Sequence, residues 1–446
     1  MTVYYSANVR PVCPSSLWLI LGCGIITCAL AARLPAATPV APSTEPIISE
    51  DAARESLADS QPQSGLVRWA GFEFFPRASA QMIYNDNLTI QPRNQLSDLL
   101  WSLSPGVMIL GGTPGVPVPP QVTFEQLRQL PRMPYVGMDN PPAKMLMLDF
   151  APDFRIYTEH SSFDTIDYAG FFSGIYGFSR LTVGLDQDFT RRTDTVADVR
   201  NLITAEELTT RLTLKYDLSD RTCVEVNGRF RDYSYEDPRF FGSRQWANMN
   251  WINRQLSGKL NAGLGVTIGY WDIDRSPSQT YEQVLARAIY RVGQKLDFTA
   301  SAGGEWRQFG GGAADALNPV FSLSGTYAPV STTSLTLEGH QTQQTSIGYS
   351  DQNYTETGFS LSVRQQVLDR FAAILAASYY ITDYSATDAQ STVSREDHYY
   401  TIRLTIEVPL SARWVSSVFY EHRGDDTGDA YAWSNNRAGL KVTWRF

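Results

Sequence analysis

The sequence predicts an all-β protein, a transmembrane up-and-down antiparallel β-barrel of about eighteen strands, with sixteen strands as the near alternative. Three observations lead to this prediction. Polarity alternates with a period of two along most of the chain, short and long connections take turns, and the last segment is an alternating strand that ends in an aromatic residue. A barrel of this size encloses an aqueous channel instead of a packed core.

The period of two is clear in segments that are long enough to test it. At positions 296–307, apolar or small residues from Leu296 to Trp306 alternate with a set that includes Asp297, Glu305 and Arg307. Successive side chains of a strand point to opposite faces, so each set occupies one face. In a barrel, the apolar face meets lipid and the charged face lines the lumen.

The connections alternate in length, as they do in a barrel that is inserted from one side. The short connections lie at 217–221, 257–259, 292–295, 329–333, 367–370 and 409–413. The long polar connections lie at 192–205, 236–244, 273–280, 310–317, 345–353, 385–396 and 424–433. A sandwich with crossover connections does not keep this rhythm, so the pattern favours short periplasmic turns and long outer loops.

One connection breaks the rhythm, a Pro/Gly-rich insertion at 111–142 that follows the second expected strand. Parity places it on the periplasmic side. We expect an exposed loop there, with a flap over the periplasmic mouth or a partial plug as alternatives. It is also the segment at which we expect any periplasmic partner to dock.

The chain begins with a segment that we expect to be removed after export. Residues 17–32 are apolar and uncharged, follow the basic residue Arg10, and contain Ala29 and Ala31 in the spacing that signal peptidase cleaves. This pattern predicts a signal peptide at residues 1–32 and Sec-type export. An uncleaved anchor is an alternative, although the stretch is shorter than the ~20 residues that span a bilayer.

The cysteines agree with export. Cys13, Cys23 and Cys28 leave with the expected signal peptide, so the mature chain keeps only Cys223 and no disulfide framework. The residues before Cys23 also resemble a lipobox, so lipidation at Cys23 stays open as a second alternative to cleavage.

Composition changes after the expected signal peptide and then again where the barrel begins. Residues 33–68 are rich in Ala, Pro, Ser and Glu without a hydrophobic period, so we expect a disordered, flexible periplasmic lead-in. The barrel is expected over 69–446. The net charge of -9 leaves no basic face for phosphates and excludes nucleic acid as a partner. The 12% of aromatic residues suits interfacial girdles.

The last strand carries a second sorting feature. Gly439, Leu440, Val442, Trp444 and Phe446 form a pattern of Gly, alternating hydrophobic residues and a terminal Phe. This pattern resembles the C-terminal β-signal that the barrel assembly machinery recognises in outer-membrane barrels. The resemblance implies insertion into the bacterial cell outer membrane, with outer-membrane lipids and lipopolysaccharide as surroundings.

The first expected hairpin resembles one family in particular. The segments Tyr-Asn-Asp-Asn at 84–87, Ser-Asp at 97–98 and Leu-Ser-Pro-Gly at 103–106 are similar to the first hairpin of a β-barrel porin family of Gram-negative outer-membrane proteins. The resemblance covers most of 70–446, although only this hairpin carries motif residues. It implies an outer-membrane barrel, and some members are proposed to act in polysaccharide export. The insertion at 111–142 departs from the compact hairpins of that family.

No pattern in the sequence indicates catalysis. His160, His340, His398 and His422 fall at or near expected strand ends, and no spacing links a nucleophile to a base. The acidic residues around Asp425 lack the Gly and Glu spacing of an EF-hand, so we expect a solvated loop there. We therefore expect no enzyme, no cofactor and no metal site.

The functional residues are instead expected on the lumen wall. Charges of both signs on the inward faces set the electrostatics of a water-filled lumen, or form cross-strand pairs that stabilise the wall. The expected lumen-lining residues are Lys215, Glu225, Arg229, Arg231, Asp297, Glu305, Arg307, Glu338, Arg403, Glu407, Lys441 and Arg445.

The function that this pattern predicts is a diffusive pore for small hydrophilic solutes or saccharides. Two alternatives remain from the residues alone: an accessory barrel for exopolysaccharide export or secretion, and a structural or adhesive barrel that acts through its outer loops. The transported substrate does not follow from the sequence.

Overall fold

The computed structural model describes residues 67–112, 144–196, 198–293, 295–368, 370–388, 393, 395–427 and 432–445. All of them belong to one compact unit, Ala36–Phe446. The expected signal peptide, nearly all of the lead-in at 33–68, nearly all of the insertion at 111–142, and Phe446 lie outside the described residues.

Nineteen β-strands and one short 3-10 helix (η1, Ser161–Phe163) make up the described part of the chain. The strands are β1 Val67–Trp69, β2 Phe72–Asn85, β3 Asp98–Gly112, β4 Lys144–Tyr157, β5 Thr165–Gly177, β6 Leu181–Val196, β7 Asn201–Ser219, β8 Thr222–Tyr235, β9 Ser243–Gln255, β10 Leu260–Ile273, β11 Gln279–Val292, β12 Leu296–Phe309, β13 Ala316–Val330, β14 Thr333–Thr345, β15 Gln352–Val367, β16 Phe371–Ala386, β17 Glu396–Pro409, β18 Trp414–Asp425 and β19 Trp433–Arg445. No helix among these described residues is long and apolar enough to cross a membrane.

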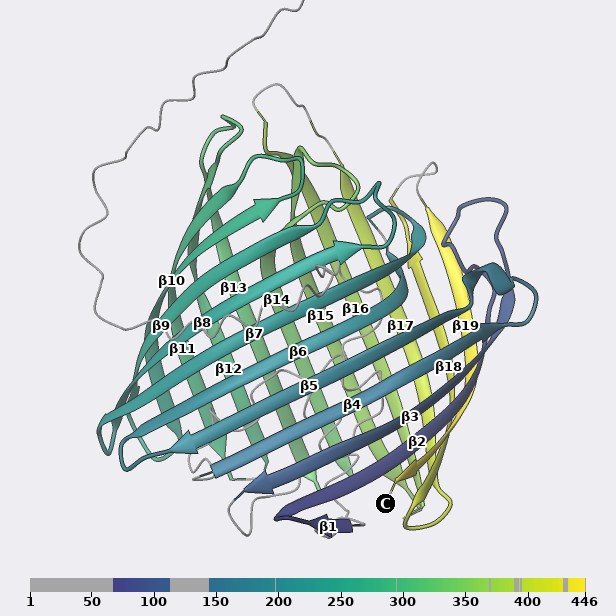
Figure 1. The fold of residues 1–446 in the computed structure, drawn as a ribbon, viewed down its shortest axis with the longest axis horizontal. Coiled ribbons are helices and arrows are strands. Elements are labelled where there is room, and N and C mark those ends of the chain that lie inside the picture. The colour runs from purple at the N-terminus through teal and green to yellow at the C-terminus, as the bar shows by residue number, and fades with distance from the viewer. Residues whose placement is uncertain are drawn as a thin grey trace, which may run out of the picture. The chain divides into compact units, whose positions relative to one another are not determined.

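The strands from β2 to β19 close into a ring. Each pairs antiparallel with the next along the chain, and β19 pairs with β2 from Arg437 opposite Asn85 to Arg445 opposite Arg77 (Figure 1). The result is the predicted all-β up-and-down barrel, with eighteen strands. The short β1 pairs only with Phe72–Phe74 of β2, on the edge of β2 beyond the end of β19. It places Val67 and Arg68 of the expected lead-in in a strand.

The strands are longer than the sequence pattern suggests. Those of the ring contain 12 to 19 residues instead of about ten, because polar residues near the outer end continue the pairing. The expected long connection at 192–205 is the clearest case. Thr193 pairs with Thr204 and Val196 with Asn201, so only residues 197–200 connect β6 to β7. That expectation was wrong.

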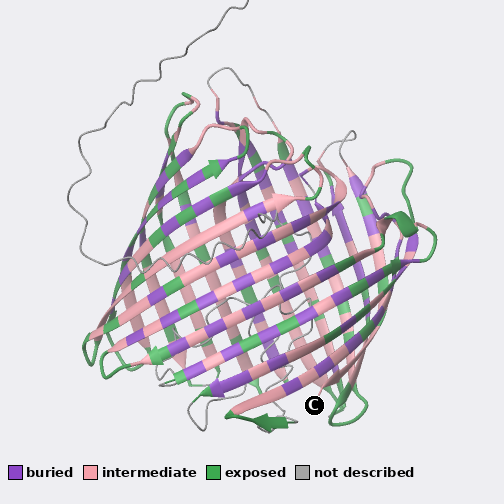
Figure 2. Ribbon diagram, viewed as in Figure 1, coloured by how far each residue is buried: buried purple, intermediate pink, exposed green. Residues whose placement is uncertain are grey.

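The burial pattern shows which face of each strand meets lipid. On β10, Leu264, Val266 and Ile268 are 64%, 47% and 57% exposed, whereas Thr267 between them is buried at 1%. Figure 2 shows the same alternation along the ribbons around the barrel. An exposed apolar face and a buried polar face invert the order of a soluble sandwich, and an outer-membrane barrel requires this arrangement.

The two ends of the barrel differ in their connections. The short turns lie at the end where β1 and the C-terminus are drawn in Figure 1, and the longer loops lie at the opposite end. Short turns are periplasmic in barrels of this class, so the longer loops face outward from the cell.

The buried apolar side chains of the described residues do not form one core. They form small clusters inside the wall, four of which include residues near the outer end.

Candidate functional site

The polar inner wall of the barrel is the candidate functional site. The strand register places all twelve expected lumen-lining residues on this polar face, because each lies opposite other members of the inward set. Lys215 faces Glu225 across β7 and β8, and Arg403 faces Glu421 across β17 and β18. The complete set is Lys215, Glu225, Arg229, Arg231, Asp297, Glu305, Arg307, Glu338, Arg403, Glu407, Lys441 and Arg445.

Many of these charges are held by a neighbour of opposite sign. Glu305 and Arg307 form an ion pair of 2.6 Å and are each 2% exposed in their side chains. The Arg307 guanidinium also lies 4.6 Å from the ring centre of Trp271. Such a desolvated, stacked pair stiffens the wall, since removing one partner leaves a buried charge uncompensated.

Other expected residues pair with partners that the alternation did not single out. Arg364 donates to Glu407 over 2.8 Å, and Arg287 forms an ion pair of 3.1 Å with Glu225. Asp297 pairs with Arg291 over 2.9 Å. Part of the inward charge is therefore paired between strands, where it stabilises the wall.

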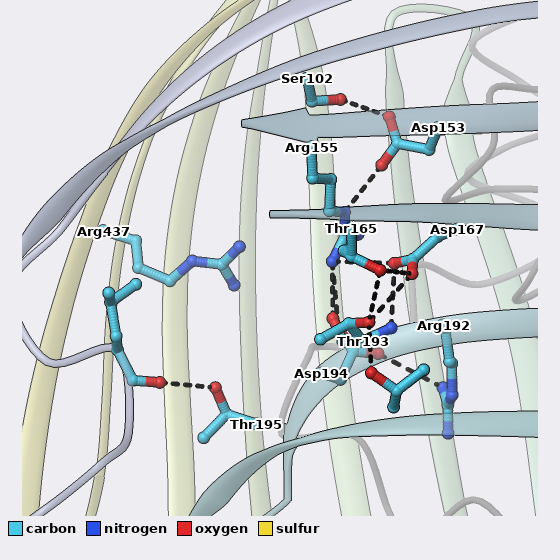
Figure 3. Close-up of polar contacts among 12 residues, drawn as sticks. Ser102, Asp153, Arg155, Thr165, Asp167, Arg192, Thr193, Asp194, Thr195 and Arg437 are labelled. Carbon is cyan, nitrogen blue, oxygen red and sulfur yellow. Dashed lines mark hydrogen bonds and ion pairs between the residues drawn. The ribbon is translucent and has the colours of Figure 1, made fainter. Parts of the chain in front are cut away.

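A dense network holds the wall at the outer end of β4 to β7. Arg155 is its centre: Nε donates to Asp153 over 2.8 Å, Nη1 lies 3.3 Å from Asp167, and Nη1 donates to the Thr193 carbonyl over 2.6 Å. Figure 3 shows these side chains converging from neighbouring strands, with Arg192 beside Asp194. A guanidinium satisfies several acceptors at once in this way because its donors are fixed in one plane.

The loop between β2 and β3 folds inward over this network. Its Leu88 and Ile90 are 2% and 0% exposed. The Thr195 hydroxyl donates to the Leu88 carbonyl over 3.1 Å, and Gln91 donates to the Arg200 carbonyl over 2.8 Å. The loop is therefore fastened to β6 and to the β6–β7 connection, while Leu88 also packs against Ile83 of β2 and Leu100 of β3.

Ile90 attaches the same loop to another part of the ring. It packs with Tyr380 on β16, Tyr399 on β17 and Trp433 on β19. Its φ of 46° lies in the left-handed region, which a β-branched residue rarely adopts. The surrounding contacts must offset the backbone strain that this conformation stores.

Asp198 joins opposite sides of the outer mouth. It lies in the β6–β7 connection, yet its carboxylate accepts hydrogen bonds from Ser346 and the Ile347 amide in the β14–β15 loop, each over 2.9 Å. It also accepts one from Tyr384 on β16 over 2.8 Å. In the closed ring, β6 and β15 lie on opposite sides, so these bonds bridge the mouth.

Arg395, in the β16–β17 connection, completes the bridge. Its Nη1 lies 3.8 Å from the Asp198 carboxylate, and the guanidinium covers the Tyr384 ring at 4.3 Å. Burial lowers the pKa of Arg395, but a hydrogen bond and the charge of Asp397 outweigh it and hold that pKa above its usual range. The bridge therefore keeps its positive charge over the accessible pH range.

The periplasmic half of the wall lines an open cavity. A cavity of about 940 Å³ lies along β7 to β11 and the β5–β6 turn. Its wall includes Lys215, Glu225, Asn227 and Arg229 from β7 and β8. We call this space the vestibule. The volume and the polar lining of the vestibule suit water and small hydrophilic solutes.

Glycines make room for the aromatic side chains in the vestibule wall. A Cβ on Gly265 would lie 2.6 Å from the indole ring of Trp251, and the Arg287 guanidinium lies over that ring at 4.3 Å. Glycine at 265 therefore allows the Trp251 ring to lie close against the backbone of β10.

The histidines and the acidic loop lie in hydrogen-bonded surroundings. His160 contacts Asp98 over 2.9 Å and His340 contacts Glu356 over 2.8 Å. His398 contacts Glu396 and Tyr379, each over 2.8 Å. Asp425 is buried at the end of β18, and Asp429 lies outside the described residues. Within the described ranges, no group of three His, Cys, Asp or Glu side chains is placed to hold a metal.

Sequence reasoning missed the residues that organise the outer end. Arg155, Asp167 and Asp198 are buried charges, but each stands in a segment that reads as an ordinary strand or loop. Alternation does put Arg155 and Asp167 on inward faces. No local pattern points to Asp198, because its partners lie about 150 to 200 positions later in the chain.

A closed antiparallel barrel with an apolar outer face and a charged lumen defines the chain as an outer-membrane β-barrel protein of a Gram-negative cell. No family model matches the chain, and neither does any curated protein.

Several solved structures have a similar fold. OccAB4 of Acinetobacter baumannii is 11% identical with a TM-score of 0.43, covering 84% of this chain and 98% of that chain. OpdO of Pseudomonas aeruginosa is 8% identical with a TM-score of 0.45, covering 84% and 97%. The outer membrane channel DcaP of Acinetobacter baumannii is 11% identical with a TM-score of 0.45, covering 86% and 100%. The barrel assignment rests on the strand pairing of this chain itself.

Proposed function

We propose that this barrel is a passage for small hydrophilic solutes or saccharides across the outer membrane. The vestibule carries the proposal: a wall of charged and amide side chains encloses about 940 Å³ inside the barrel. A barrel with only a structural role has no need of such a space. A polar cavity of this volume admits a hydrated ion or a small sugar.

The bridged outer mouth sets the expected behaviour of the passage. Asp198, Arg395 and the inward loop at 86–97 lie between the vestibule and the outside, so passage requires these loops to move. We therefore expect a small basal conductance with brief openings, since loop motions of this kind occur over microseconds to milliseconds.

The test is single-channel recording in planar bilayers with the refolded full-length mature barrel, together with liposome swelling in a panel of neutral sugars. Discrete conductance steps and sugar-dependent swelling support the passage. A correctly folded barrel that stays silent in both assays, even when Asp198 is replaced to loosen the bridge, contradicts it. Folding is checked by the heat-dependent gel migration of intact barrels.

Export of a polysaccharide is the second candidate, and the position of the vestibule favours it. The vestibule lies at the periplasmic end, whereas the bridge lies at the outer end, as a conduit loaded from the periplasm requires. On this proposal, a periplasmic partner docks at the insertion. Deleting 113–142 leaves β3 and β4 intact and abolishes polymer release from cells without unfolding the barrel. Normal release from the deletion strain contradicts this candidate.

A further inference from the structure

The vestibule is basic although the whole chain is acidic. Its wall contains eight basic and three acidic side chains, while the complete chain has a net charge of -9. Asp188 and Asp297 lie just outside the wall and pair with Arg211 and Arg291. Even with these two carboxylates included, basic residues exceed acidic ones by three.

Half of these basic groups are without an ion pair among the described residues. Arg180, Arg221, Arg229 and Lys259 form no ion pair within the part of the chain that the structure describes. Arg180, Arg221 and Lys259 come from three successive periplasmic turns and are exposed at the rim. Arg229 lies deeper on β8, and its Nη2 donates to the amide of Gln245 over 3.3 Å. The positive charge therefore extends from the rim into the vestibule.

The remaining wall supplies hydrogen-bonding groups beside this charge. Arg287 is held between Glu225 and the Asn253 amide, to which it donates over 2.6 Å. Asn227, Gln255 and Asn261 add further amides on β8, β9 and β10. An amide can donate a hydrogen bond to a hydroxyl group or accept one from it. A guanidinium group binds a carboxylate through two parallel hydrogen bonds.

We propose that the vestibule selects acidic saccharides, solutes that carry a carboxylate among several hydroxyl groups. This inference rests on the proposed function, because it names the class of solute that the passage takes. A cluster of like charges in a cleft with low-dielectric walls concentrates ions of opposite sign. Anions therefore enter from the periplasmic end more readily than cations, and a uronate binds better than the neutral sugar of the same shape.

The first experiment measures the reversal potential of the refolded barrel in a potassium chloride gradient at low salt. We expect chloride to permeate better than potassium. The variant Arg180→Gln/Arg221→Gln/Lys259→Gln removes three exposed rim charges, and we expect the chloride-to-potassium permeability ratio to fall by about twofold or more. The control is Arg254→Gln, which removes an exposed charge from the lipid-facing side of β9 at the same height and leaves the ratio unchanged.

The second experiment does not need an open channel. Saturation-transfer NMR on the barrel in detergent compares D-galacturonate with D-galactose. We expect a signal for galacturonate that weakens in the triple variant and persists in Arg254→Gln. Equal signals for both sugars, or a galacturonate signal that the triple variant leaves unchanged, overturn the inference. So does a conducting barrel that prefers potassium. A silent barrel that still binds galacturonate contradicts the proposed passage and leaves this selectivity supported.

Discussion

At the scale of single residues, charge in this barrel has two roles that the structure separates. Arg155 and Asp198 are buried, and each has several partners, most of them on other strands or loops. Arg221 and Lys259 are exposed and form no ion pair among the described residues. We expect replacement of the first kind to change stability or the outer mouth, and replacement of the second kind to change selectivity.

Replacing Arg155 by alanine is expected to destabilise the barrel by about 3 kcal/mol, because Asp153 and Asp167 are left buried without their cation. The measurement is the midpoint of urea unfolding in lipid vesicles. Arg254→Gln serves as the exposed control and should leave the midpoint unchanged. If Arg155→Ala unfolds at the same urea concentration as the wild type, the network does not stabilise the wall.

Replacing Asp198 by alanine is expected to raise the open probability several-fold, because the loops lose the acceptor that joins opposite sides of the mouth. The strands keep their pairing, so the unfolding midpoint should change little. The control is Asp237→Ala in the neighbouring outer loop. Its side chain is 32% exposed, against 2% for Asp198, and among the described residues it pairs with Arg239 alone. A wild-type open probability in Asp198→Ala counts against the bridge.

The control residue Asp237 has an expected dependence of its charge on pH. Hydrogen bonds from Arg239 hold the pKa of Asp237 below its usual range, so that group keeps its charge until the pH falls below the ordinary value of a carboxyl. The exposed pair is consequently present at neutral and mildly acidic pH and is lost only in strong acid. Channel recordings between pH 5 and pH 8 should therefore give the same open probability for Asp237→Ala as for the wild type.

At the scale of elements, the strands follow from local pattern and the loops do not. The alternation over 296–307 predicted β12 with the correct faces, and the turns near 220, 258 and 331 fall where short connections were expected. Strand ends were less predictable. Thr193 to Val196 read as a polar loop, but their pairing with β7 holds them in strand, because polar side chains at the outer end are satisfied inside the mouth.

No local sequence pattern indicates that the loop at 86–97 folds inward. Its position depends on Thr195 and Arg200 of β6 and its connection, and on Tyr380 and Tyr399 of β16 and β17. Such contacts join residues that are more than a hundred positions apart. The period of polarity and the composition of turns carry no information about these long-range contacts. A single sequence therefore predicts the strands of the wall but not the loops that reach across the lumen.

The terminal strand gives a fourth prediction. Gly439 lies inward under the ring of Phe419, and a Cβ there would also lie 2.9 Å from the Met82 carbonyl of β2. Gly439→Val is therefore expected to reduce the amount of assembled barrel severely, because it forces β19 away from β2, the pair that closes the ring. Heat-dependent gel migration measures the assembled fraction.

Gly228 is the matched control for that experiment. It lies mid-strand on β8, where a Cβ would meet no atom within 4 Å, so Gly228→Val should assemble normally. If both variants assemble equally well, the Phe419 contact does not explain the glycine of the C-terminal pattern. Recognition of that pattern by the assembly machinery stays a proposal, and it predicts that loss of Phe446 lowers assembly in cells but not refolding in detergent.

At the scale of the whole molecule, the barrel is asymmetric along its axis. The outer end is crossed by hydrogen-bonded loops, and the periplasmic half contains a basic vestibule. On the proposed function, these features make a passage that is positive at its periplasmic end and bridged by loops at its outer end. Solutes are then concentrated in the vestibule before they meet the bridged loops.

The conductance of single refolded barrels in planar bilayers tests this account most directly. We predict small, discrete, anion-selective steps in the wild type, and steps of higher open probability in Asp198→Ala. Folded barrels that conduct no ions in either form would contradict the account.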